Sequence, residues 1–187
     1  MKRLAAALIL LTSAVHADGP PKGWWAAPTD DYVIALDETA QREGKPSVSI
    51  KCLAENPKSF AALNQTFSAQ DYRGKRVRLT GRVKTSAVAK WAGFWLRADS
   101  ANGSILAFDN MQNRGVSGTS DWKPGAIVLD IPEDSETLHL GFILDGKGTA
   151  WATGIVFEEV DASVPVTNMR TPELSLPRKP VNLDFTE

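Results

Sequence analysis

The chain has 187 residues and a formal net charge of −1, from 21 basic and 22 acidic side chains. This length suits one domain of roughly 140–150 residues plus a tail. A near-neutral charge without a basic block argues against nucleic-acid binding, and every apolar run is too short to cross a bilayer as a helix. Cys52 is the only cysteine, so an intramolecular disulfide is excluded.

Residues 1–17 have the features of a secretory signal peptide. Lys2 and Arg3 form a short positive region, residues 4–11 are uniformly apolar, and Val15 and Ala17 supply small residues before a cleavage site. We therefore expect cleavage before Asp18 and a periplasmic or secreted mature protein. An uncleaved N-terminal anchor is the alternative.

Residues 32–160 consist of short alternating segments separated by Gly, Pro, Asn and Asp turns, which is the pattern of a β-sandwich. The expected strands are 32–36, 47–53, 60–67, 76–85, 93–99, 104–108, 126–131, 137–144 and 150–160. Asn102-Gly103 is the clearest hairpin turn. A turn of helix is expected only within residues 56–62.

The alternation also assigns faces to several strands. In residues 138–144 the even-numbered side chains form an apolar row that faces the core. In residues 76–85 the odd-numbered side chains point inward, and the basic row on the other face is interpreted as a solvated sheet surface. Cys52 shares the apolar face of its strand, so we expect a buried structural thiol.

The segment 91–99 is the most informative part of the sequence. Its even-numbered residues are apolar and core-facing, whereas Trp91, Trp95 and Arg97 lie on the opposite face with Gly93 and Asp99. Two tryptophans beside an arginine are unusual on a bare sheet surface. Aromatic rings cover the apolar faces of sugars, and charged side chains bond their hydroxyls. These residues either bind a carbohydrate or lie under a long loop as a second, minor core.

A loop dense in polar side chains and glycines is expected between Phe108 and Trp122. Its candidate ligand-binding groups are Asp109, Asn110 and Arg114. Trp122 is either a ligand platform or a plug that pins the loop onto the sandwich. Its position just before a strand favours the plug.

The sequence contains no recognisable catalytic or metal-binding motif. His139, the only histidine after the predicted signal peptide, lies mid-strand without a nucleophile motif nearby, so a structural role is expected. Cys/His metal spacing and phosphate-binding loops are absent from the sequence. We expect no cofactor, and the one metal considered is a structural Ca²⁺ near Asp37, Gly44 and Glu158. A hydrolase that uses Asp109 and Asp121 is a remote alternative.

The chain resembles galactose-binding-domain-like jelly rolls, which are similar in plan to the carbohydrate-binding modules of bacterial exported proteins. The motifs that carry the resemblance are Tyr32, Asp37, Gly44-Lys45-Pro46-Ser47, Tyr72-Arg73-Gly74-Lys75-Arg76-Val77, Trp95-Leu96-Arg97, Asp109-Asn110-Met111, Gly118-Thr119-Ser120-Asp121-Trp122 and Gly148-Thr149-Ala150-Trp151. The resemblance covers about residues 23–160 and implies binding on a concave face. Related modules carry an Asp pair where this chain has Thr153-Gly154, which weakens the inference of a metal.

The tail, residues 161–187, contains four prolines and no periodicity, so extended chain is expected. Related modules often open with a strand like Asn182-Leu183-Asp184-Phe185, which here stands near the C-terminus. We therefore predict a final strand at residues 181–185. It would complete the sandwich of its own chain, or that of a neighbour by strand exchange.

The sequence thus predicts an all-β, single-domain jelly-roll β-sandwich at residues 18–160 that acts as a non-catalytic exported binding module. The expected ligand is a glycan or another hydroxyl-rich, polar molecule. Its predicted contacts are Trp91, Trp95, Arg97, Asp109, Asn110, Arg114 and Trp122. The alternative is a protein-interaction or assembly module that uses the same aromatic face.

Overall fold

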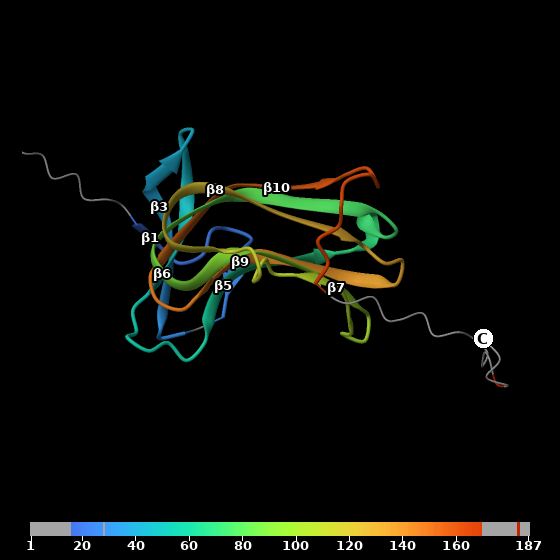
Figure 1. Cartoon of the computed structure of the whole chain (residues 1–187), viewed down its shortest axis with the longest axis horizontal. Coiled ribbons are helices and arrows are strands. Elements are labelled where there is room, and N and C mark those ends of the chain that lie inside the picture. Colours follow the sequence, from blue (N-terminus) through green and yellow to red (C-terminus); the bar gives the residue numbers. More distant parts are fainter. Residues whose placement is uncertain (1–15, 28, 170–182, 184–187) are drawn as a thin grey trace, which may run out of the picture.

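The computed structural model describes residues 16–27, 29–169 and 183. These residues form antiparallel strands in two layers (Figure 1). The strands are β1 (His16–Asp18), β2 (Trp25–Ala26), β3 (Tyr32–Arg42), β4 (Lys45–Cys52), β5 (Phe60–Ser68), β6 (Arg76–Ser100), β7 (Ile105–Asp109), β8 (Val116–Asp130), β9 (Ser135–Asp145) and β10 (Thr149–Glu159). A short 3-10 turn, η1 (Gln70–Tyr72), lies between β5 and β6.

The long strand β6 belongs to both layers. Its first half pairs with β10 and β8, and its second half pairs with β9 and β7. The first sheet therefore has the order β1-β3-β4-β10-β6-β8, and the second has the order β2-β5-β9-β6-β7. Between the two halves, the register with β8 shifts three times from Val83 to Ala92, and Ala87 has a φ of 52°. Such bulges bend a strand, which lets β6 pass from one sheet to the other.

The core lies between the two sheets and is centred on Phe94. This side chain is fully buried, and its ring centroid lies 5.9 Å from that of Phe142. On the facing sheet, Gly81 and Gly125 are register partners across β6 and β8. A Cβ atom at Gly81 would lie 2.4 Å from Phe94 Cζ, and one at Gly125 would lie 2.9 Å from Phe94 Cδ2. The two glycines therefore leave the space that the phenylalanine fills, which interlocks the sheets.

The predicted strand faces are confirmed. The even-numbered side chains of residues 138–144 and of residues 92–98 are buried, as are the odd-numbered ones of residues 77–83. Two basic residues of the outer row form ion pairs, Arg76 with Asp130 at 2.6 Å and Arg78 with Glu158 at 2.7 Å. Cys52 is partly buried against the core.

Three predicted boundaries are wrong. The segments 76–85 and 93–99 are halves of one strand, because β6 runs without interruption from one sheet into the other. β8 begins at Val116, so part of the predicted polar loop is strand. The helical turn expected within residues 56–62 is absent from the described structure, because β5 begins at Phe60; the helical turn that it does contain is η1.

The first residues of the predicted tail connect the two sheets. Thr167 N donates to Val128 O of β8, and Met169 N donates to Phe108 O of β7, both at 2.8 Å. The Arg76 guanidinium donates to the carbonyls of Ala162 and Val164 while it pairs with Asp130. Figure 1 shows this segment passing from the end of β10 to β7. It covers two edge strands that would otherwise expose unpaired backbone groups.

Two predictions lie largely outside the described residues. Of the predicted signal peptide, only residues 16 and 17 are described, and β1 runs across the expected cleavage position. Of the predicted final strand at residues 181–185, only Leu183 is described, as a turn residue. Among the described residues, none of the helices has the length and apolar character needed to span a membrane.

Candidate functional site

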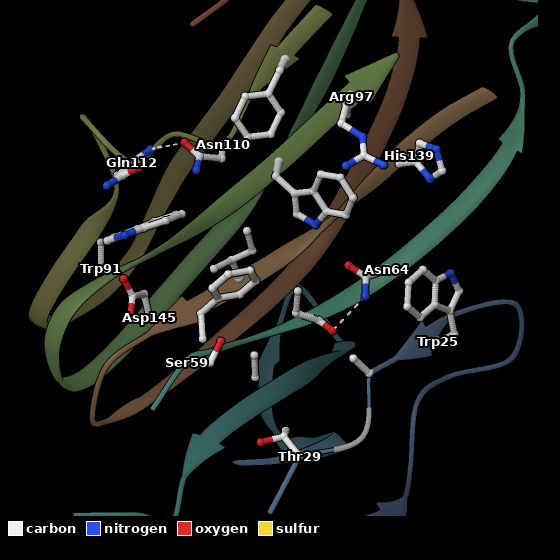
Figure 2. Close-up of a pocket in the computed structure, with 17 residues that line it drawn as sticks. Trp25, Thr29, Ser59, Asn64, Trp91, Arg97, Asn110, Gln112, His139 and Asp145 are labelled. Atoms are coloured by element: carbon white, nitrogen blue, oxygen red, sulfur yellow. Dashed lines mark hydrogen bonds between the residues drawn. The ribbon is translucent and has the colours of Figure 1, made fainter. Parts of the chain in front are cut away.

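The second sheet carries a cavity of about 750 Å³ on the face that points away from the core. Side chains from β2, β5, β6, β7 and β9 and from the loop after β7 line it (Figure 2). The position follows from strand alternation: the even-numbered residues of 92–98 fill the core, so Trp91, Trp95 and Arg97 face the cavity. A volume of this size is in the usual range of small-molecule sites, about 300–1,000 Å³.

Aromatic side chains make up the floor and part of the rim. Trp91 and Trp95 come from β6, and the half-exposed side chains of Trp25 and Phe60 come from β2 and β5. Gly141, the register partner of Trp95 on β9, has no side chain to obstruct the indole; a Cβ atom there would lie 2.2 Å from Trp95 Nε1. Its glycine backbone therefore lets the Trp95 ring lie close to the sheet.

Gly115 likewise leaves space for the side chain of Trp91. A Cβ atom at Gly115 would lie 2.9 Å from Trp91 Cε3 and 3.0 Å from Trp91 Cβ. Each indole on the floor thus packs over a glycine of a neighbouring segment. At neither glycine does a side chain compete with the indole for this space.

Arg97 and His139 line the polar end of the cavity, and both contact the buried side chain of Asp99. Arg97 Nη2 lies 2.8 Å from Asp99 Oδ2, and His139 Nε2 lies 3.2 Å from the same oxygen. The imidazole of His139 also contacts Thr66 Oγ1 at 3.0 Å and Thr137 Oγ1 at 3.1 Å. Its ring is nearly parallel to that of Trp95, at 12° and a centroid distance of 6.5 Å. Burial and the charge of Arg97 lower the pKa of His139, whereas Asp99 raises it, and the net shift is downward.

Other polar side chains line the walls. Asn64 is buried, and its Nδ2 donates to Ala62 O at 3.1 Å. Asn110 Oδ1 accepts from Gln112 N at 3.1 Å, which orders the loop after β7. Asp145 is the register partner of Trp91 and pairs with Lys90 at 2.9 Å. Hydrogen-bonding groups thus surround an aromatic floor, as in sites that bind polar molecules with apolar faces.

The structure brings four of the seven predicted site residues to this cavity: Trp91, Trp95, Arg97 and Asn110. It places Asp109 elsewhere, because its carboxylate is fully buried, accepts from Met111 N at 2.8 Å and pairs with Arg114 at 2.6 Å. Arg114 also donates to Ala126 O at 3.0 Å, so this pair orders the loop. Trp122 lies on β8 in the first sheet, with Lys84 Nζ 5.9 Å from its ring centroid.

Several lining residues were not predicted from the sequence. They include Trp25, Phe60, Asn64, His139 and Asp145. His139 and Asp145 lie on the odd-numbered face of β9, which pairs with residues 91–100 of β6. That alternation was visible in the sequence, but the pairing of these two strands was not. The structural role predicted for His139 is compatible with its three polar contacts, although the ring also lines the cavity.

Among the described residues there is no group of three or more potential metal ligands. Asp37, considered for a structural Ca²⁺, accepts hydrogen bonds from Thr39, from Ala40 N at 3.0 Å and from Trp151 Nε1 at 2.8 Å. Burial raises the pKa of Asp37, but these hydrogen bonds outweigh it and lower the pKa to about 2. Glu158 pairs with Arg78. Both carboxylates therefore already have donors from the protein.

Comparison with protein families gives no matching family model. A curated relative, named an uncharacterized HTH-type transcriptional regulator YbfP of Bacillus subtilis (strain 168), is 41% identical over 169 residues. The match covers 89% of this chain and 57% of the relative, so this chain spans little more than half the relative's length.

Solved structures show the fold. The CBM22-1 xylan-binding domain of Paenibacillus barcinonensis Xyn10C is similar over 78% of this chain and 91% of that domain, with 17% identity and a TM-score of 0.53. A family 16 carbohydrate binding module-2 matches 74% of this chain and 92% of its own, with 15% identity and a TM-score of 0.52.

The enzymatically active domain of tailspike protein 4 from bacteriophage CBA120 is also similar, with 12% identity and a TM-score of 0.58. This match covers 74% of our chain but only 20% of the tailspike chain. At these identities the likeness shows the fold alone. The expected galactose-binding-like jelly roll is confirmed: the chain has the fold of carbohydrate-binding modules.

Proposed function

We propose that this chain is a non-catalytic carbohydrate-binding module and that the cavity on the second sheet is its binding site. The observation that carries the proposal is the floor of Trp91 and Trp95, which β6 presents away from the core beside Arg97. Sugar rings have apolar C–H faces and polar edges. The indole rings would cover the apolar C–H faces, and the surrounding polar side chains would form hydrogen bonds with the polar edges.

The length of the cavity fits more than one sugar unit. Trp91 and Arg97 are six residues apart on one strand, which corresponds to about 20 Å. Figure 2 shows Trp91 and Asp145 on one side of the cavity and Arg97 and His139 on the other. A short stretch of a glycan would therefore contact both ends at once.

The comparisons support a binding module. One structural neighbour is named a xylan-binding domain. The curated relative is named an HTH-type regulator, and this chain matches only part of it. A module that binds a ligand without changing it is compatible with both a xylan-binding domain and a part of a regulator. The signal-like residues 1–17 support a periplasmic or secreted location for this chain.

A protein-interaction module is the second candidate, and the exposed rim favours it. Trp25 is 50% exposed and Phe60 is 54% exposed, and both line the cavity. Exposed aromatic side chains of this kind are enriched at the centre of protein interfaces. The two candidates differ in whether a soluble polysaccharide occupies the cavity.

Affinity electrophoresis in gels that contain soluble xylan, β-glucan, galactan, mannan, pectin or alginate tests the proposal. We expect at least one polysaccharide to retard the wild-type protein and Trp95→Ala to remove that retardation. Trp122→Ala is the matched control because it deletes a tryptophan from the other sheet. Melting curves of both variants establish that they fold. Unretarded migration of the wild-type protein in every gel would refute glycan binding and favour the protein-interaction module.

A further inference from the structure

The polar end of the cavity has a distinct charge arrangement. Among the described lining residues, Arg97 is the only lysine or arginine, and its side chain is 32% exposed. Asp99, which pairs with it, is almost fully buried and does not line the cavity. The cation is therefore turned toward the cavity, and its counterion lies behind it.

Arg97 retains unused donors. A guanidinium group has five N–H donors in a planar fork that suits carboxylates. Asp99 Oδ2 contacts Nη2 at 2.8 Å, and Nη1 makes no hydrogen bond within the part of the chain that the structure describes. Nε is buried and also lacks a partner there, so the donors that a ligand can reach are those of the two Nη groups. The exposed end of the guanidinium therefore has N–H donors available for a ligand acceptor, and a hydrogen bond to this charged group is stronger than one between neutral groups.

We propose that the glycan bound by this module carries a carboxylate, as uronic acids do, and that Arg97 binds this carboxylate at the polar end of the cavity. This inference rests on the proposed function and narrows its ligand class. If the sugar were neutral, the guanidinium donors would face only hydroxyl groups. A carboxylate matches both their charge and their geometry.

His139 supplies a compensating charge. The charged groups that face it are Asp99 and Arg97 on β6, whereas Thr66 on β5 and Thr137 on its own strand are neutral. Because the charges of Arg97 and Asp99 cancel, a bound ligand carboxylate gives this cluster a net negative charge. Such a charge raises the pKa of His139 and favours proton uptake on binding. A ligand that binds the protonated form more tightly gains affinity as the pH falls.

The opposite end of the cavity limits how many carboxylates fit. Asp145 lines that end beside Trp91, and its pairing with Lys90 leaves its side chain 23% exposed. A second carboxylate there would face an acidic side chain. The cavity is therefore suited to an acidic unit at Arg97 with neutral units toward Trp91.

Carboxyl reduction provides matched ligands for the test. Oligosaccharides from glucuronoxylan and gum arabic, which carry uronic acids among neutral units, are compared with the same oligosaccharides after each carboxylate is reduced to a primary alcohol. Isothermal titration calorimetry measures affinity at pH 7.5 and pH 5.5. Since charge-assisted hydrogen bonds are stronger than neutral ones, we expect the acidic form to bind at least about tenfold more tightly than the reduced form, with a larger ratio at pH 5.5.

Variants separate charge from shape. Arg97→Gln should abolish the preference for the acidic form, and Arg97→Lys, which perturbs the Asp99 pair but keeps the charge, should retain part of it. Arg82→Gln, on the outer face of the first sheet, is the control. Equal or tighter binding of the reduced form to the wild-type protein would overturn the inference and leave the proposed function standing. Absence of binding to both forms and to every neutral polysaccharide would overturn both.

Discussion

Replacement of Gly141 by alanine tests whether the fold and the cavity floor depend on the same backbone position. The added Cβ atom would lie 2.2 Å from Leu63 O on β5, 2.2 Å from Trp95 Nε1 and 3.1 Å from Trp95 Cδ1. The indole and the paired strand would both have to move, because Leu63 O is a backbone atom. Overpacking of this kind costs roughly 1–3 kcal/mol, and the backbone clash favours the upper end.

A loss of about 3 kcal/mol corresponds to a fall in Tm of about 6–12 °C for a domain of this size. Thermal unfolding followed by circular dichroism measures it, and urea unfolding gives the free energy directly. Gly93→Ala is the matched control on the same face, since the nearest atom to its Cβ would be Met111 Cβ at 3.2 Å, in place of a backbone oxygen at 2.2 Å; we expect a smaller loss of stability than for Gly141→Ala. A Gly141→Ala protein that melts within about 2 °C of wild type would refute the packing argument.

Three further perturbations follow from the same structure. Phe94→Ala should lower the free energy of unfolding by about 3–5 kcal/mol in urea titrations, because its buried ring fills the space above two glycines; a loss below about 1 kcal/mol would contradict that packing. Asp37→Asn should cost about 2 kcal/mol at pH 7, since a carboxyl pKa of about 2 in the folded state stabilises the protein above the unfolded pKa of 3.8. This stability is lost as the pH falls through about 2, so the wild-type advantage over Asp37→Asn should shrink between pH 5 and pH 2, and a constant difference would exclude the carboxylate as its source. Arg76→Ala should speed limited proteolysis within residues 161–169, because the guanidinium binds two carbonyls of that segment; unchanged cleavage would show that other contacts hold it.

The sequence predicted those parts of the fold that depend on local alternation. Residues 92–98 and 138–144 show a strict two-residue period, and their buried faces were predicted correctly. The continuity of β6 was not visible, because the register shifts around Ala87 interrupt the alternation at the point where the strand changes sheets. A period of two describes a face but does not reveal a strand that serves two sheets.

The candidate site was predicted in part for the same reason. Trp91, Trp95 and Arg97 share one face of one strand, and local alternation brings them together. Asp109 and Arg114 were grouped with them because polar loops often bind ligands; the structure places both outside the cavity lining, where their mutual ion pair orders the loop. The distinction depends on burial of the Asp109 carboxylate, which residue type and spacing do not encode.

Trp25, Phe60 and His139 reach the cavity through strand pairing. β2 and β5 pair with each other, and β5 and β6 both pair with β9, which places segments distant in the sequence on one surface. Such long-range pairing is set by the whole sandwich and not by any single segment. The sequence therefore identified the strand that carries the floor of the cavity but not the strands that complete its walls.

The indole N–H signals of the six tryptophans provide the most direct test of the central claim, that the cavity on the second sheet binds a glycan. Nuclear magnetic resonance resolves one indole signal for each ring. The protein is titrated with an oligosaccharide of the polysaccharide that retards it most in affinity electrophoresis, and the signals that shift identify the rings near the ligand. We predict that the signals of Trp25, Trp91 and Trp95 shift saturably, because these rings line the cavity. The signals of Trp122 and Trp151, on the first sheet, should stay in place. Shifts confined to Trp122 and Trp151 would contradict the account and place the binding surface on the opposite sheet.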